Sequence, residues 1–187
     1  MPVTDFTSGL EGWTTDNFTA THVADGGNPG GYARGVEGGS GVWCFVAPVA
    51  YLGDQEALYG GTFSYDQQQD ITKSRFSDID VILVGGGLIL VAGAGANPGT
   101  DWTHYSLDLE LGGGWKVSSL GGRVATEGEI LTVLGDLTAI KIRGEFVEGT
   151  SGDASGLDNV EMIAGAITPP PALSSVVEST FNSDVEG

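Results

Sequence analysis

The sequence has few basic residues and no long apolar run, and each shortage excludes a class of protein. Only 7 Lys and Arg stand against 25 Asp and Glu, which gives a formal net charge of −18. Such a surface repels phosphate backbones and anionic lipid headgroups. No apolar stretch approaches the roughly 20 residues that a membrane-spanning helix needs. We therefore expect no nucleic-acid partner and no membrane insertion.

Cysteine is almost absent, because Cys44 is the only one. A single cysteine cannot form a disulfide within the chain. It lies among the bulky apolar residues of Val42–Val46, with no basic residue or His beside it to activate a thiolate. We interpret Cys44 as a small buried hydrophobic residue rather than a catalytic nucleophile.

Glycine and short β-rich segments are what the chain has in abundance. At 187 residues with 40% hydrophobic content and 32 Gly, it is long enough for one well-buried domain rather than two. Short runs of β-forming residues recur between turn residues, which is typical of an all-β sandwich. We predict strands at Phe18–Val23, Tyr32–Val36, Val42–Val46, Thr62–Tyr65, Ile79–Val84, Leu88–Val91, Thr103–Leu109, Trp115–Val117, Ala139–Phe146 and Leu157–Ile163.

Two of these regions make more specific predictions. Apolar and charged residues alternate in Ile140–Phe146, which predicts a strand with one solvent-facing side. Val81–Val84 and Leu88–Val91 are continuous apolar runs on either side of a glycine turn. We predict that they form a central hairpin covered on both faces.

One helix is also expected. Thr126 and Glu129 have the spacing of a capping box, and apolar residues follow at helical spacing. The pattern predicts a helix near Glu127–Leu134 that closes one end of the sandwich. The predicted fold class is therefore all-β, an antiparallel jelly-roll β-sandwich with one short helix.

The two ends of the chain repeat each other. Thr4–Gly12 reads TDFTSGLEG and Ser179–Gly187 reads STFNSDVEG, with four identities in register. Three prolines, Pro169–Pro171, precede the second occurrence and favour an extended spacer. We expect a module over residues 1–164, a Pro-rich linker over 165–177 and the start of a second tandem copy over 178–187. The N-terminus has no secretion signal, which we attribute to excision from a longer protein or to a C-terminal signal.

Several strings resemble the laminin IV (laminin B) domain, in the order in which that family carries them. The opening Phe6–Trp13 and the glycine loop Gly26–Tyr32 are the first two. The others are Trp43–Pro48, Tyr51–Asp54, Tyr59–Tyr65, Trp102–Tyr105, Ile140–Glu145 and Leu157–Val160. Together they cover nearly all of residues 5–163.

The resemblance implies an extracellular, non-enzymatic module. It also implies a fold similar to the galactose-binding-like jelly rolls of carbohydrate-binding modules. Animal copies lie beside cysteine-rich repeats, which this chain lacks, so it looks like a bacterial relative with different neighbours. We expect it outside the cell or at the cell surface.

The resemblance further implies a structural calcium ion. Asp158 matches the position that usually supplies a carboxylate from the last strand. Calcium takes six to eight oxygen ligands, and the partners that we expect come from the N-terminal segment, the glycine loop and the following strand: Asp5, Asp25, Asn28 and Glu37. Thr7 stands where related modules commonly carry Glu, which removes one ligand. The alternative is that Asp158 caps a turn before the last strand.

The remaining candidate groups have simpler interpretations. The aromatic residues that a sugar site would use also fall within motifs of the family, so packing is the expected role of Trp43, Trp102, Trp115, Tyr51 and Tyr105. Asp78 and Asp80 lie two apart like a glycosidase pair, but a solvated strand face or a second cation site explains them better.

Two functions remain open from the sequence. The first is a structural or adhesive repeat whose partners are neighbouring copies of the module, docked head to tail through residues 178–187. The second is a carbohydrate-binding module that targets an attached protein to a glycan or to extracellular matrix. A sugar binder needs exposed aromatic residues with polar groups between them, and a spacer needs none.

Overall fold

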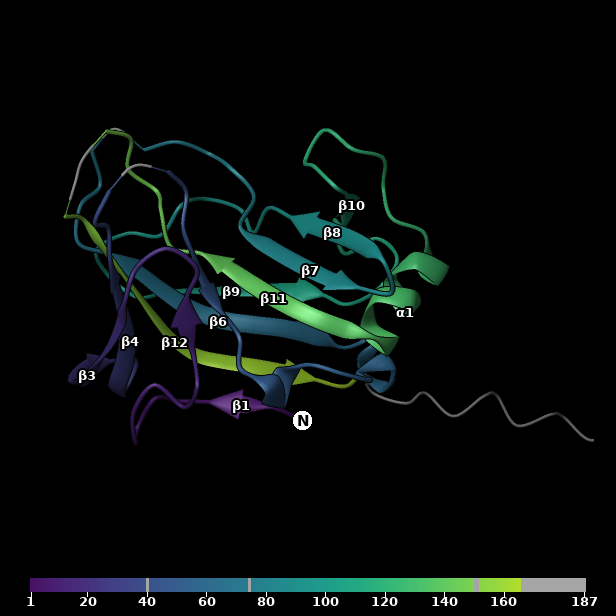
Figure 1. Cartoon of the computed structure of the whole chain (residues 1–187), viewed down its shortest axis with the longest axis horizontal. Helices are drawn as coiled ribbons and strands as arrows, with labels where there is room; N and C mark the ends of the chain where they lie inside the picture. The colour runs from purple at the N-terminus through teal and green to yellow at the C-terminus, as the bar shows by residue number, and fades with distance from the viewer. Residues whose placement is uncertain (40, 74, 150–151, 166–187) are drawn as a thin grey trace, which may run out of the picture.

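The computed structural model describes residues 1–39, 41–73, 75–149 and 152–165. Within them the chain forms two six-stranded antiparallel sheets packed face to face, with one α-helix at the end (Figure 1). This confirms the predicted jelly-roll sandwich. The predicted second copy over 178–187, and all of the predicted linker except Gly165, lie outside the described residues, so that division of the chain stays a prediction.

The first sheet, sheet A, is built around the last strand of the domain. Its order is β3 (Ala20–Gly27), β4 (Gly30–Val36), β12 (Ala154–Ile163), β6 (Thr62–Gln69) and β9 (Thr103–Asp108), with β1 (Val3–Thr4) also pairing with β12. The second, sheet B, has the order β10 (Lys116–Val117), β8 (Leu88–Ala92), β7 (Val81–Gly85), β11 (Leu137–Arg143), β5 (Cys44–Val46) and β2 (Thr14–Thr15). Two short 3-10 helices, Val49–Tyr51 and Glu56–Leu58, follow β5.

All ten predicted strands are present, with shifted ends. Sequence reasoning missed β1 and β2, which are only two residues long each. Side chains alternate between the two faces of a strand with a period of two residues. A two-residue strand therefore contains one period only, which is too short for alternation to be recognised in the sequence.

Strand β12 changes its partner part-way along, and this places one of the sites described below. Its first half pairs with β4, and its second half pairs with β1. The register against β6 shifts between Asp158 and Glu161. Asn159 takes a left-handed conformation there, with φ of 48°. This bulge lets the tip of the β3–β4 hairpin approach Asp158.

The two sheets meet around large aromatic side chains. Trp43 is the clearest case, because its ring lies against two glycines from different sheets. A Cβ atom on Gly35 of β4 would lie 2.2 Å from the ring, and one on Gly144 after β11 would lie 2.1 Å from it. Both positions therefore require glycine for the sheets to close over Trp43.

The predicted helix is α1 (Glu127–Gly135), and its capping box is present. The Thr126 hydroxyl accepts from the Glu129 amide, while the Glu129 carboxylate accepts from the Thr126 amide at 2.9 Å. The helix packs beside the β7–β8 turn at one end of the sandwich (Figure 1). The end-closing role predicted for it agrees with this position.

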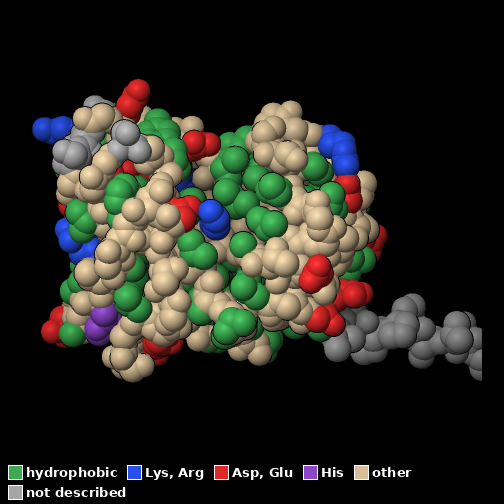
Figure 2. Space-filling model, viewed as in Figure 1, with side chains coloured by type: hydrophobic (Ala, Val, Ile, Leu, Met, Phe, Trp, Pro, Cys, Tyr) green, Lys and Arg blue, Asp and Glu red, His purple; other side chains and the backbone are tan. Residues whose placement is uncertain are grey.

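Two surface predictions were wrong. The outer face of the β7–β8 hairpin is not covered, because Ile89 is 44% exposed and apolar side chains gather over the middle of this face (Figure 2). Arg143, predicted to face solvent, is buried. The rings of Phe146 and Phe76 cover its guanidinium, at 4.1 and 5.5 Å from their centroids.

Candidate functional site

Two clusters of buried carboxylates lie along β12, and each contains a pair of acidic residues placed directly opposite one another. The first is Asp66 of β6 opposite Asp158 of β12. We call it the amide-bound pair, because backbone and side-chain N–H groups surround it. Like charges directly opposite on neighbouring strands are destabilising unless something neutralises or solvates them.

The donors of the amide-bound pair come from the β3–β4 tip, the β12 bulge and β9. Asp158 accepts from the backbone amides of Asn28 at 2.5 Å and Asn159 at 2.7 Å. Asp66 accepts from the side-chain amides of Asn28 at 3.0 Å and Asn159 at 2.8 Å, and from His104 Nδ1 at 2.7 Å. Burial raises the pKa of Asp158 to about 6, while the backbone amides of Asn28 and Asn159 act to lower it.

These contacts test the expected calcium ligands. Asp158 and Asn28 lie together as predicted, but what Asn28 directs at Asp158 is a donor N–H rather than an oxygen. Asp5 and Asp25 are exposed, and Asp5 accepts from the amide of Thr7. The N–H donors that surround Asp158 do not favour a cation at this carboxylate. The calcium ion expected at Asp158 therefore gains no support from these contacts and stays a prediction. The turn-cap alternative is wrong, because Asp158 lies inside β12.

Glu37, the remaining predicted ligand, belongs to the second cluster. It follows β4, and its amide donates to the carbonyl of Asp153, just before β12. Continuing the β4–β12 register places these two side chains opposite each other, on the side of sheet A that faces sheet B. Asp153 is five residues before Asp158, about 16 Å along an extended strand. The structure therefore divides the predicted ligand set between two places.

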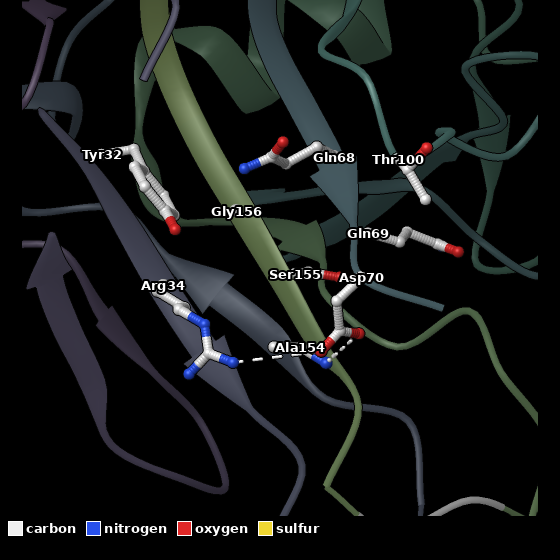
Figure 3. Close-up of a pocket in the computed structure, with 9 residues that line it drawn as sticks. All are labelled: Tyr32, Arg34, Gln68, Gln69, Asp70, Thr100, Ala154, Ser155 and Gly156. Atoms are coloured by element: carbon white, nitrogen blue, oxygen red, sulfur yellow. Dashed lines mark hydrogen bonds and ion pairs between the residues drawn. The ribbon is translucent and has the colours of Figure 1, made fainter. Parts of the chain in front are cut away.

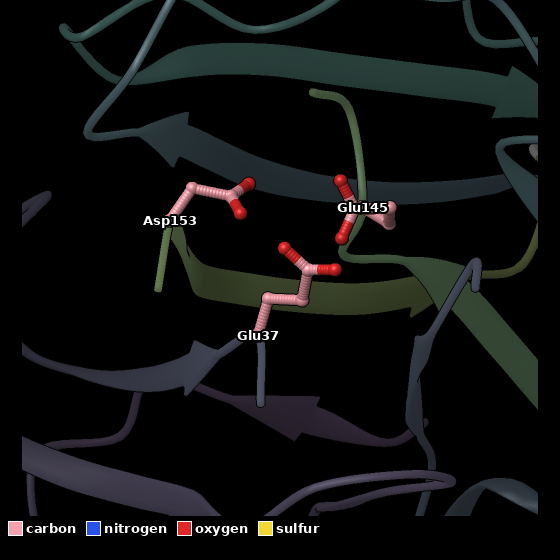
Figure 4. Close-up of side chains that lie close together, drawn as sticks. All are labelled: Glu37, Glu145 and Asp153. Atoms are coloured by element: carbon pink, nitrogen blue, oxygen red, sulfur yellow. The ribbon is translucent and has the colours of Figure 1, made fainter. Parts of the chain in front are cut away.

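Glu145 completes this second cluster from the other sheet. It lies two residues beyond the end of β11, and the three side chains point toward one another (Figure 4). One oxygen from each of Glu37, Glu145 and Asp153 lies within 4.8 Å of the others, and all three residues are buried. We call this group the acidic triad. Its arrangement of oxygens could hold a metal ion.

The acidic triad has few donors among the described residues. The Val147 amide donates to Glu145 at 3.0 Å, and the Trp43 indole N–H also acts to lower the pKa of Glu145. Within the part of the chain that the structure describes, one buried oxygen each of Glu37, Glu145 and Asp153 has no hydrogen-bond partner. Burial raises the pKa of Asp153 well above its ordinary range, and the facing Glu37 carboxyl adds to the rise. Burial also raises the pKa of Glu145.

Glu145 and Asp153 were missed by sequence reasoning. Glu145 appeared in the string Ile140–Glu145 only as a charged residue on an alternating strand, and Asp153 carried no pattern at all. The one usable signal was that Glu37, like Gly35 and Ala33, falls on the inward-facing positions of β4. A carboxylate at an inward position requires a partner.

A groove of about 250 Å³ runs over the opposite, outer face of sheet A (Figure 3). Its floor is Gly156 of β12, where a Cβ atom would lie 2.9 Å from Trp102 and 3.0 Å from Tyr32 and Gln68. Tyr32 and Trp102 stand edge to face, with ring centroids 5.4 Å apart. Arg34 and Asp70 form an ion pair at 3.9 Å along the same groove.

The other candidate groups have structural roles. Trp43, Trp115, Tyr51 and Tyr105 are buried in the core as predicted. Trp102, the fifth aromatic candidate, is partly exposed and packs against Tyr32, which lines the groove. Cys44 is buried, and burial raises its pKa to about 12, so it is no nucleophile. Asp80, predicted to lie on a solvated strand face or in a second cation site, is buried and pairs with Arg143 at 2.6 Å.

The comparisons with known proteins agree with this architecture. The laminin B (domain IV) family matches residues 44–178, so the chain belongs to this family. It is 28% identical over 175 residues to laminin subunit gamma-1 of Xenopus tropicalis, covering 88% of this chain and 10% of that protein. It is 32% identical over 140 residues to laminin subunit gamma-1 of Homo sapiens, covering 72% of this chain and 8% of that protein. The chain thus spans about a tenth of the length of the curated relatives it matches.

Two solved structures share the fold. The L4b domain of human laminin alpha-2 has a TM-score of 0.56 at 18% identity, over 66% of this chain and 71% of that chain. A family 11 carbohydrate-binding module of a Clostridium thermocellum cellulase has a TM-score of 0.54 at 13% identity, over 87% and 92%. Both confirm the sandwich architecture. Among the described residues, no helix has the length and apolar character needed to cross a membrane.

Proposed function

We propose that this chain is a non-catalytic extracellular module with a structural or adhesive role in a larger protein. Its membership of the laminin B (domain IV) family carries the proposal. The buried groups that sequence reasoning weighed for chemistry support it, because Cys44 and Asp80 are engaged in packing and in an ion pair.

Location is the first test of this proposal. Antibodies against the module should label intact cells of the source organism, or its culture fluid, without permeabilisation. Labelling that appears only after the cells are permeabilised would contradict an extracellular role. A cytoplasmic protein of the same organism, probed in parallel, controls for leakage.

Neighbouring copies of the module are the partners that we propose for the structural role. The proposal rests on the repeat of Thr4–Gly12 at Ser179–Gly187. Such a contact joins different surfaces, so it propagates into a filament unless it closes into a ring. Deleting residues 178–187 should reduce the mass measured by light scattering. An unchanged mass would contradict assembly through residues 178–187. It would not bear on the proposal that the module is extracellular.

Glycan binding is the second candidate, and the groove on sheet A favours it. Gly156 lets the side chains of Tyr32, Trp102 and Gln68 pack closely onto β12 beside the groove, and the polar groups of Arg34, Gln68 and Asp70 line it. Aromatic faces with polar groups between them suit a sugar, which has both apolar C–H faces and hydroxyl edges.

The substitution Gly156→Ala tests this candidate, because the added methyl group would lie 2.9–3.0 Å from Trp102, Tyr32 and Gln68 and would force these side chains beside the groove to move. We expect glycans bound on an array by the wild-type chain to be lost by G156A and by Trp102→Ala. Val49→Ala, which changes an exposed apolar residue elsewhere, should keep them. Binding that survives in G156A and W102A would exclude this groove as the sugar site.

A further inference from the structure

We propose that the acidic triad is a calcium site that ties the two sheets together. Glu37 and Asp153 come from neighbouring strands of sheet A, and Glu145 comes from the end of β11 in sheet B. An ion bound to all three would bridge the sandwich at the end where Trp43 is enclosed between Gly35 and Gly144. The proposal does not depend on the function proposed above.

The spacing of the oxygens fits one ion. Calcium binds oxygens at 2.3–2.6 Å, so two ligands on opposite sides of it are about 4.6–5.2 Å apart. The three oxygens of the triad lie within 4.8 Å of one another. Three carboxylates offer up to six oxygens, which reaches the lower end of calcium's coordination number. Magnesium fits less well, because it retains several waters and demands a tighter octahedron.

The unpaired oxygens are a second, independent reason. Glu37 Oε2, Glu145 Oε2 and Asp153 Oδ1 are all buried and have no hydrogen-bond partner among the residues that the structure describes. Buried carboxylates without donors or counter-charge cost several kcal/mol each in general, and proteins neutralise them with protons, cationic side chains or metals. The Arg143 guanidinium has a small lowering effect on the pKa of Glu145, and it is already paired with Asp80 at 2.6 Å.

Binding to the full 187-residue chain tests the proposal, after metal removal with a chelator and dialysis. We expect calorimetric titration to show one calcium per chain, weaker binding of magnesium, and a calcium-dependent rise in melting temperature. Glu145→Gln and Asp153→Asn should each weaken calcium binding at least tenfold. Asp158→Asn, in the amide-bound pair, should leave the affinity within about twofold of wild type.

The metal-free proteins supply the control for folding. Because E145Q and D153N remove a repelling charge, their melting temperatures in chelator should equal or exceed that of the wild type. Unfolding of these variants in chelator would contradict the premise that the carboxylates repel one another. A wild-type chain that binds no calcium, or a chain in which D158N abolishes binding while E145Q and D153N retain it, would overturn the proposal.

Discussion

The amide-bound pair and the acidic triad are built on the same strand from the same kind of contact, yet their surroundings differ. Each places two carboxylates opposite one another beside β12: Asp66 with Asp158, and Glu37 with Asp153. Five N–H groups donate to the first pair. Among the described residues, one backbone amide donates to the triad, and the Trp43 indole N–H also acts on Glu145.

The difference lies in what covers each pair. The β3–β4 tip and the β12 bulge fold over Asp158 and bring the backbone and side chain of Asn28 with them. The triad instead lies between the sheets, where the Val147 amide is the described backbone group that donates to it. The sandwich thus supplies many donors to one acidic pair and few described donors to the other, which is where we propose that an ion binds.

The buried ion pair between Arg143 and Asp80 should give the largest change in the free energy of unfolding. The changes expected at the two acidic clusters can be compared with it. Replacing Arg143 by Met leaves Asp80 buried without its partner. We expect a loss of about 3–5 kcal/mol of unfolding free energy, because an uncompensated buried charge remains. Denaturant unfolding measures it, and a loss below about 1 kcal/mol would show that Asp80 finds other solvation.

Lys141→Met is the matched control for that measurement. Lys141 also projects from β11 and pairs with an acid, Asp16, at 3.0 Å, but both side chains are partly exposed. Exposed ion pairs contribute about 0–1 kcal/mol. The contrast between R143M and K141M therefore isolates the effect of burial.

Asp158→Ala should have the next largest effect, and it should not depend on calcium. The change removes the acceptor of the Asn28 and Asn159 amides at the bulge. Leaving a buried donor unsatisfied costs about 1–3 kcal/mol. We expect the same loss in calcium and in chelator, with the exposed Asp25→Ala unaffected in both. A loss of stability seen only in calcium buffer would indicate that the ion binds at Asp158, and it would contradict the difference drawn between the two clusters.

Glu129 is a partly exposed carboxylate paired with Arg123, and its effect on stability should be smaller and depend on pH. The Arg123 guanidinium lowers the pKa of Glu129 to about 2, and the Thr126 amide assists. Because this pKa lies below its unfolded value of 4.5, the stabilisation is present above pH 4.5 and is lost as the pH falls toward 2. Glu129→Gln should therefore flatten the acid limb of the unfolding curve; an unchanged limb would contradict the assignment.

Glu37→Gln in chelator should have the smallest effect of all, and its sign is informative. Glu37 Oε2 has no partner to lose, and the change removes a charge that faces Asp153. We expect a melting temperature equal to or above that of the wild type. A clear destabilisation without metal would mean that the Glu37 carboxylate makes a favourable contact within the protein.

Much of the fold was predictable because its signals are local. The capping box of Thr126 and Glu129 predicted the start of α1, and short alternating or β-rich runs between turn residues predicted ten strands. Arg143 was misplaced because alternation reports which side of a strand a residue takes and not what covers that side. One of the two rings that cover it, Phe76, lies 67 residues away in the sequence.

The acidic triad could not be assembled from the sequence for the same reason. Glu37 and Asp153 meet only because β4 pairs with β12, and Glu145 joins them only because the two sheets close around Trp43. The amide-bound pair was half predicted, since a resemblance pointed to Asp158 and the glycine loop. Its partner Asp66 needed the register between β6 and β12.

Crystals of the full chain soaked with terbium, a calcium substitute with a strong anomalous signal, test the central claim most directly. The account predicts an anomalous peak between the carboxylates of Glu37, Glu145 and Asp153, and none beside Asp158. A peak at Asp158 with an empty triad, or no peak within the sandwich at saturating terbium, would contradict it.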